Sequence, residues 1–288
     1  MSIKKILAPV QSSVGAKGGV EAAIHLAKHF RAHVEAVHIR QAPNAAVDGY
    51  SALGVMAVEP IAAITEALAE QANSFSASVR DAAKKLGVEF AKCADHRDDR
   101  GATISWRDQQ GLVFYDQAAA ARVADLVVMA SPEGEEPFED APLLEELAFQ
   151  SGRPVLAAPS GKLDGAPKRI FIAWNGSREA ARALSASEPF LAGAEAALVA
   201  TAGEIERALP GPERAGDLLR LHGVPVEARH IDVARGGAED ALLDSARAWR
   251  ADLIVMGAYS HARWREIVLG GFTRKMMKQR DLPLLIAH

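Results

Sequence analysis

Short unbroken runs of Ile, Leu and Val recur along the chain, and stretches with helical spacing of apolar residues separate them. The runs lack the apolar–polar alternation of a half-exposed strand. They suit strands buried on both faces of a parallel sheet, although a buried helix fits the same pattern. In the second half we expect strands at 197–200, 226–231 and 251–256, and helices starting at Ser177 and covering 204–222, 238–249 and 272–277. Such alternation of strands and helices predicts an α/β, doubly wound fold.

Three of these runs occur twice in the same order, which indicates an internal duplication. The matched pairs are 4–10 with 168–174, 124–129 with 251–256, and 153–157 with 282–286. We therefore expect two copies, 1–160 and 167–288, joined by a small polar linker. Each copy is predicted to be a flavodoxin- or Rossmann-like domain with a mostly parallel five-stranded sheet and helices on both faces. The first copy also contains a long helical pattern around 61–86.

Composition narrows the class of protein. The chain has 288 residues, of which 49% are hydrophobic and 6% aromatic, and a net charge of −4. This balance gives no global attraction for nucleic acid or an anionic membrane. One cysteine excludes an intrachain disulfide and a multi-cysteine metal site. No signal-peptide pattern and no run of ~18–20 apolar residues is present, so a soluble, cytoplasmic protein is expected.

The most promising chemistry lies in a glycine-bearing loop near the C-terminus. Gly257 follows a buried strand, and Gly270 and Gly271 precede an expected helix that starts with Phe272 and Thr273. Ligands of doubly wound sheets bind beyond the carboxyl ends of the strands, where the free amides of a helix N-terminus suit a phosphate. A turn, a helix cap and a solvated basic face would give the same pattern.

Local charge distinguishes the two copies. Residues 130–153 contain seven acids and one base, whereas residues 257–280 contain six bases and one acid. A phosphate would be repelled by the first segment and attracted by the second. If the chain has one phosphate site, we expect it in the second copy.

These motifs resemble those of the universal stress protein family, in its tandem two-domain form. The family signature is Gly, two residues, Gly, nine residues, Gly, then Ser or Thr. This chain has Gly257, Ser260, Gly270 and Gly271 at those positions, with Thr273 two residues further on. Residues 172–180 resemble the family's first strand and loop, where ATP-binding members carry an Asp in place of Asn175. Residues 282–288 resemble its final strand.

The resemblance implies a stress-response protein that binds ATP or another adenine nucleotide, with Mg²⁺, in its second domain. Its binding residues would be Ala173, Asn175, Gly176, Ser177, Met256, Gly257, Ser260, His261, Arg263, Gly270, Gly271, Phe272 and Thr273. The two domains would pack as an intramolecular pseudo-dimer, with a homodimer as a further option. No catalytic residues and no protein metal site are expected.

Two other functions fit the same residues. A nucleotide-independent interaction module would use the acidic 133–140 and basic 263–280 surfaces to bind a protein partner. Slow ATP hydrolysis is the enzymatic alternative, although no carboxylate in the motif is an obvious candidate to position water.

Three further segments have simpler interpretations. Residues 12–19 are rich in glycine but lack the Gly-Lys-Ser/Thr ending of a Walker loop, so a flexible turn into the first helix is expected. His25, His29 and His33 have the spacing of one helical face, too extended for one zinc ion, and are expected to be solvated. Residues 41–60 are expected to form a surface loop, with a lid as the alternative.

Overall fold

The computed structural model describes residues 2–41, 58–97, 99, 101–131, 139–206, 208–233, 237–258 and 271–288. For residues 58–62 and 271 it describes the backbone alone. Residues 42–57 lie outside the described part, so the surface loop or lid expected over 41–60 stays a prediction there, whereas residues 58–60 are helical.

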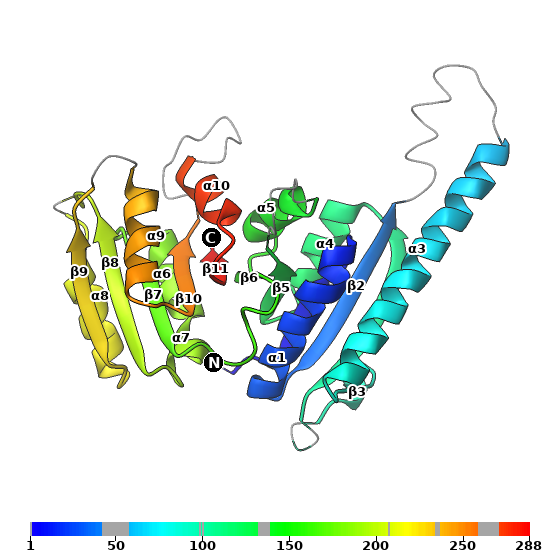
Figure 1. Cartoon of the computed structure of the whole chain (residues 1–288), viewed down its shortest axis with the longest axis horizontal. Coiled ribbons are helices and arrows are strands. Elements are labelled where there is room, and N and C mark those ends of the chain that lie inside the picture. The colour runs from blue at the N-terminus through cyan, green and yellow to red at the C-terminus, as the bar shows by residue number, and fades with distance from the viewer. Residues whose placement is uncertain are drawn as a thin grey trace.

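The described strands form one sheet that runs through the whole molecule (Figure 1). Its order is β3-β4-β2-β1-β5-β6-β11-β10-β7-β8-β9. The strands of the N-terminal half are β1 (Lys5–Pro9), β2 (His33–Gln41), β3 (Glu89–Phe90), β4 (Thr103–Gly111), β5 (Leu126–Ala130) and β6 (Val155–Ala158). Those of the C-terminal half are β7 (Arg169–Ala173), β8 (Ala196–Ala202), β9 (Val226–Ile231), β10 (Leu253–Gly257) and β11 (Leu284–Ala287).

Helices cover both faces of this sheet. In the N-terminal half they are α1 (Val20–Phe30), α3 (Val58–Lys85), α4 (Val113–Ala121) and α5 (Ala141–Gln150), with short helical turns η1 (Gly15–Gly19) and η2 (Cys93–Asp95). In the C-terminal half they are α6 (Arg178–Ala186), α7 (Glu188–Leu191), α8 (Pro212–Leu221), α9 (Ala238–Ala248) and α10 (Gly271–Lys278). The predicted α/β class with helices on both faces is confirmed.

The two halves repeat one strand order and meet at their last strands. Within each half every described strand pairing is parallel, and the predicted five-stranded unit is present in both. The N-terminal half adds the two-residue edge strand β3. Between the halves, β6 and β11 pair antiparallel, with Leu156 opposite Leu285. The molecule is therefore two α/β units that share one continuous sheet.

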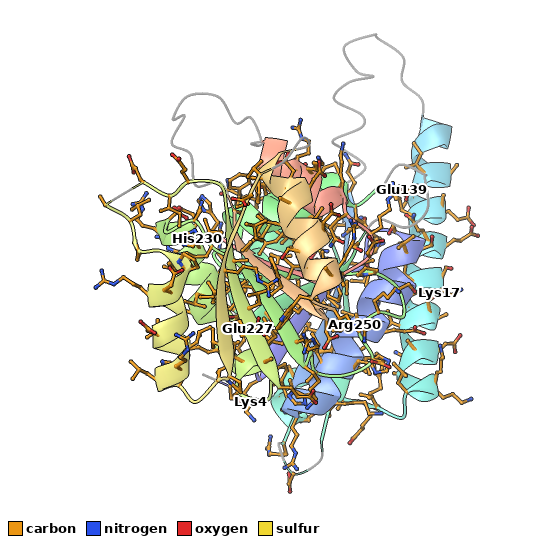
Figure 2. The ribbon with its side chains drawn as sticks, turned by 60° about the vertical axis from the view of Figure 1, so that its left-hand side comes forward. Lys4, Lys17, Glu139, Glu227, His230 and Arg250 are labelled. Atoms are coloured by element: carbon orange, nitrogen blue, oxygen red, sulfur yellow. The ribbon has the colours of Figure 1, made fainter. Side chains whose placement is uncertain are left out.

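Each face of the sheet has its own hydrophobic core, and both cores extend across the two halves. One core lies beneath α1, α3, α6 and α8, and the other beneath α4, α5, α9 and α10. On the first face the rings of Phe30 and Phe190 meet edge to face, with centroids 5.4 Å apart. The halves therefore pack through side chains as well as through the shared sheet. In Figure 2, Glu227 and His230 of β9 lie toward one side of the molecule, and Lys17 and Glu139 of the N-terminal half lie toward the other.

An aspartate that recurs in the repeat fixes the start of the first strand of each half. Asp125 Oδ2 accepts the backbone N–H groups of Lys4 and Lys5, at 2.8 and 3.0 Å. Asp252 Oδ2 accepts those of Lys168 and Arg169, both at 2.9 Å. Because a carboxylate accepts several hydrogen bonds, one side chain satisfies two amides at the end of the ladder. The recurring Ala-Asp-Leu sequence therefore has a structural role in both copies.

Two sequence expectations about elements are wrong. The helix expected over 204–222 begins only at Pro212, since Gly203 turns the chain with φ +77° and the pair Gly211-Pro212 supplies the N-cap and first position. Residues 12–19 do not form a flexible turn, because helix starts at Ser13 and continues through the π-turn η1.

The histidine stripe is also different from the expected one. Helix α1 ends at Phe30, so His33 lies on β2 and does not share a helical face with His25 and His29. His33 is buried, and its ring nitrogens lie 2.8 Å from Thr103 Oγ1 and 2.9 Å from Ser105 Oγ. Burial is the main cause that lowers the pKa of His33 to about 4. The ring is therefore neutral at physiological pH and has a structural environment.

Candidate functional site

The first part of the candidate site is the loop that joins β7 to α6. It starts after Ala173, at the carboxyl end of β7, and Trp174 follows it as a buried residue. Thr201 Oγ1 on the neighbouring strand donates to the Trp174 carbonyl at 2.7 Å, and Trp174 Nε1 donates to the Pro210 carbonyl at 2.8 Å. These bonds hold the start of the loop between β8 and the segment before α8.

Asn175, Gly176 and Ser177 form a turn that ends in a helix cap. Asn175 is exposed, and its Oδ1 accepts the backbone N–H of Ser177 at 3.1 Å. Ser177 Oγ accepts the N–H of Ala180 at 3.1 Å, so Ser177 is the N-cap of α6. Gly176 has φ +75°, and a Cβ there would lie 2.8 Å from Leu209 Cβ, so both backbone and space require glycine. Asn175 is thus presented at the surface by a well-defined turn.

Gly257 brings the end of β10 against the first turn of α6. A Cβ on this residue would lie 2.4 Å from both Ala180 N and the Glu179 carbonyl carbon. The family resemblance implies a ligand contact for this glycine, and the structure shows that a helix backbone approaches it closely. Met256, one residue earlier, is buried in the core beneath α9 and α10. The strand end and the β7–α6 loop are therefore adjacent.

Helix α10 contributes its N-terminal turn to the same edge of the sheet. It begins at Gly271, Phe272 is partly buried, and Thr273 is buried with 4% of its surface exposed. The other predicted binding residues, Ser260, His261, Arg263 and Gly270, lie outside the described residues. Eight of the nine predicted residues that the structure describes belong to the β7–α6 loop, the strand ends and the first turn of α10, and Met256 lies in the core.

The positive charge counted from the sequence is partly neutralised. Lys275 Nζ on α10 lies 2.7 Å from Asp240 Oδ2 and 4.0 Å from Glu239 Oε1, both on α9. The hydrogen bond to Asp240 is the main cause that raises the pKa of Lys275. Because Lys275 forms an ion pair with α9, fewer basic side chains are left to bind an anion than the six counted in residues 257–280.

The corresponding edge of the N-terminal half contains a buried carboxylate that sequence reasoning missed. Asp140, directly before α5, is 6% exposed, and its Oδ2 accepts the hydroxyl of Ser12 at 2.5 Å. Ser12 Oγ in turn accepts the backbone N–H of Gly15 at 3.0 Å. These two hydrogen bonds join the start of α5 to the β1–α1 loop.

Burial of the Asp140 carboxylate lowers the stability of its charged form. Burial raises the pKa of Asp140 above its ordinary value, the hydrogen bond from Ser12 opposes this, and the negative charge of Glu139 adds to it. A raised pKa in the folded state means that the carboxyl stabilises the fold fully only at acid pH. This contribution disappears as the pH rises through the folded-state pKa.

We therefore expect Asp140→Asn to be more stable than the parent at pH 7, by about 1 kcal/mol, because the amide oxygen still accepts from Ser12 without a buried charge. The advantage is expected to shrink as the pH falls, because the buried carboxyl then becomes protonated and loses its charge. Urea unfolding at several pH values measures it, with Asp164→Asn in the exposed linker as the control. A variant less stable than the parent at pH 7 would show that the charge itself stabilises the fold.

The described residues at this edge carry hydrogen-bonding groups. Among them no group of three His, Cys, Asp or Glu side chains could hold a metal ion. None of the described helices is both long and apolar enough to cross a membrane. Within those residues the edge offers helix N-terminal amides, hydroxyls and one amide side chain, which are hydrogen-bonding groups for an anionic or polar ligand.

Comparison with known families and structures supports the fold. Residues 168–288 match the model of the universal stress protein family. A universal stress protein from Archaeoglobus fulgidus is 12% identical, with a TM-score of 0.70 over 98% of this chain and 97% of its own. A putative universal stress protein from Pseudomonas aeruginosa is 14% identical, with a TM-score of 0.54 over 99% of this chain and 93% of its own. No curated protein sequence matches the chain.

A shorter solved protein matches part of the chain. It is a universal stress protein in complex with cAMP, 22% identical over 43% of this chain and 99% of its own, with a TM-score of 0.34.

Proposed function

We propose, on the premise that residues 168–288 belong to the universal stress protein family, that the C-terminal half binds an adenine nucleotide such as ATP. The observation that supports this most directly is the geometry of one edge of the sheet. There, the turn at Asn175–Ser177 lies beside the end of β10, and the same edge carries the N-terminus of α10. In doubly wound folds, nucleotides bind at this edge, outside the carboxyl ends of the strands.

Each described group has a proposed role. Asn175 faces the ribose, with its exposed amide as donor and acceptor. The amides of Gly271 and Phe272 and the hydroxyl of Thr273 bind phosphate at the start of α10. Ala173, Gly176, Ser177, Met256 and Gly257 shape the crevice. Ser260, His261, Arg263 and Gly270 complete the proposed site from outside the described residues.

One nucleotide per chain is proposed, because the equivalent space in the N-terminal half holds the Asp140 carboxylate. A phosphate would be repelled by that charge. We accordingly divide the chain into a degenerate domain, 1–160, and a binding domain, 167–288, and propose that they act as an intramolecular pseudo-dimer.

The proposed activity is binding in a stress response, without a catalytic step. Mg²⁺ is commonly held through substrate phosphates and one or two carboxylates, so it would arrive with the nucleotide.

Calorimetric titration with ATP and Mg²⁺ tests the proposal, with GTP as the comparison. We expect one ATP per chain and weaker binding of GTP. Absence of ATP binding would contradict the proposal and favour the interaction module instead. Two equivalent sites per chain would contradict the assignment of a degenerate first domain.

Asn175→Asp is expected to strengthen ATP binding about fivefold, because a carboxylate accepts hydroxyl hydrogen bonds more strongly than an amide does. The same titration measures this effect. Gln11→Asp is the matched control, since Gln11 holds the corresponding place in the N-terminal half, and it is expected to leave the affinity unchanged. An unchanged affinity in Asn175→Asp would remove Asn175 from the ribose side of the site.

A further inference from the structure

A groove separate from the nucleotide edge lies between the helices on one face of the C-terminal half. Its volume is about 540 Å³, within the range of small-molecule sites. One wall is α6 with α7, and the opposite wall is α8. Trp174 and Pro210 lie at the end nearest the carboxyl edge of the sheet, and His222 and Val224 lie at the other end.

The lining of this groove is mainly apolar. Its apolar side chains are Trp174, Ala181, Leu184, Pro189, Leu191, Ala192, Pro210, Ala215, Leu218, Leu219 and Val224. Leu218 is 48% exposed, although leucine normally gains from burial. In the N-terminal half the long helix α3 packs against α1 and buries Phe75 and Val79. The corresponding face of the C-terminal half therefore differs, because it leaves Leu218 partly exposed. An apolar body of a ligand would cover the surface that α8 leaves open.

Charge within the groove is polarised along its length. Arg214 lies in the first turn of α8, at the end marked by Trp174 and Pro210. Glu188 lies at the start of α7, toward the end marked by His222. From Arg214 to His222 the helix rises about 12 Å, which sets the length of the groove. One end is therefore basic, and the other contains an acid.

The guanidinium of Arg214 has no acidic partner among the described residues. The neighbouring acids on α8 contact other side chains. Glu213 Oε1 lies 3.2 Å from His230 Nε2, and Asp217 forms an ion pair with Arg220 at 2.7 Å. The Arg214 guanidinium makes no ion pair or hydrogen bond with any described residue, and Arg214 lines the groove. A guanidinium beside an apolar slot is complementary to a ligand with an acidic head and an apolar body.

We propose that this groove binds an amphipathic monoanion, such as a medium-chain carboxylate, with its carboxylate at Arg214 and its chain along α6 and α8. The apolar walls contribute affinity by covering exposed leucine surface, and Arg214 selects the acidic head over a neutral or cationic one. The groove meets the nucleotide edge at Trp174, but none of the residues proposed to bind the nucleotide lines it.

Calorimetry of the full chain with decanoate, below its micelle concentration, tests the inference. Decanol and decyltrimethylammonium are the matched neutral and cationic probes. We expect decanoate to bind at one site, decanol more weakly and the cation most weakly. Absence of decanoate binding, or tighter binding of the cation than of decanoate, would overturn the proposal.

Three variants locate the site. Ala181→Phe fills the groove from an exposed helix position, so it should preserve folding and weaken decanoate binding at least about tenfold. Arg214→Gln should weaken decanoate binding about fivefold and leave decanol unchanged. Arg182→Gln, an exposed arginine on α6 outside the lining, is the control and should match the parent. Decanoate binding unaffected by Ala181→Phe would place the ligand elsewhere and contradict the proposal.

Discussion

Replacing Gly257 by alanine is expected to lower the free energy of unfolding by about 3 kcal/mol, the upper range for overpacked sites. The new Cβ would lie 2.4 Å from Ala180 N and the Glu179 carbonyl carbon, and backbone atoms cannot move aside as the end of a flexible side chain can. Either β10 or the first turn of α6 must shift. Because that turn carries the Ser177 cap beside Asn175, ATP binding is expected to weaken at the same time.

Urea unfolding and ATP titration of Gly257→Ala measure both effects. Gly193→Ala is the matched control, since a Cβ at Gly193 meets nothing within 4 Å. It is expected to stay within about 0.5 kcal/mol of the parent. If Gly257→Ala were as stable as the parent, α6 and β10 would not pack as closely as described.

Leu285→Asp is expected to have the larger effect, a loss of more than about 4 kcal/mol. Leu285 is fully buried on β11, opposite Leu156 of β6 and beside Val255 of β10. A carboxylate there would be desolvated where the two halves join. Since the sheet and both cores continue across that join, we expect both halves to lose structure together.

Soluble yield and urea unfolding, followed by the intrinsic fluorescence of tryptophans in both halves, check this prediction. Leu221→Asp is the control, because Leu221 is 85% exposed and should tolerate the same change. Retention of a native transition for Trp106 in the N-terminal half would show that the halves fold independently, in conflict with their shared sheet.

Much of the fold was predictable because buried parallel strands leave a strong local signal. The expected strand 226–231 coincides with β9, and the expected helix at 238–249 differs from α9 by one residue. Internal repetition added a second signal, since three of the apolar runs appeared twice. The Asp125 and Asp252 contacts explain why a polar residue was preserved inside that repeated run.

The candidate site was less predictable because its key contacts join residues distant in sequence. Ser12 and Asp140 are 128 residues apart, and nothing near either one indicates the other. A weak local signal existed, since an Asp two residues before Pro142 is typical of a helix start. The pairing of Lys275 with Asp240 is another distant contact, and it shows why counting charges along a loop overstates the field near a ligand.

The antiparallel pairing of β6 with β11 has an evolutionary consequence. Two identical single-copy molecules that met through their last strands would carry every pocket substitution twice. Within one chain, the two partners are encoded separately and always meet each other in a fixed ratio. A contact such as that between Ser12 and Asp140 can then arise at the carboxyl edge of one half while the corresponding edge of the other half keeps Gly257. The shared sheet thus makes the protein an obligate pair of unlike partners, free to specialise without losing its assembly.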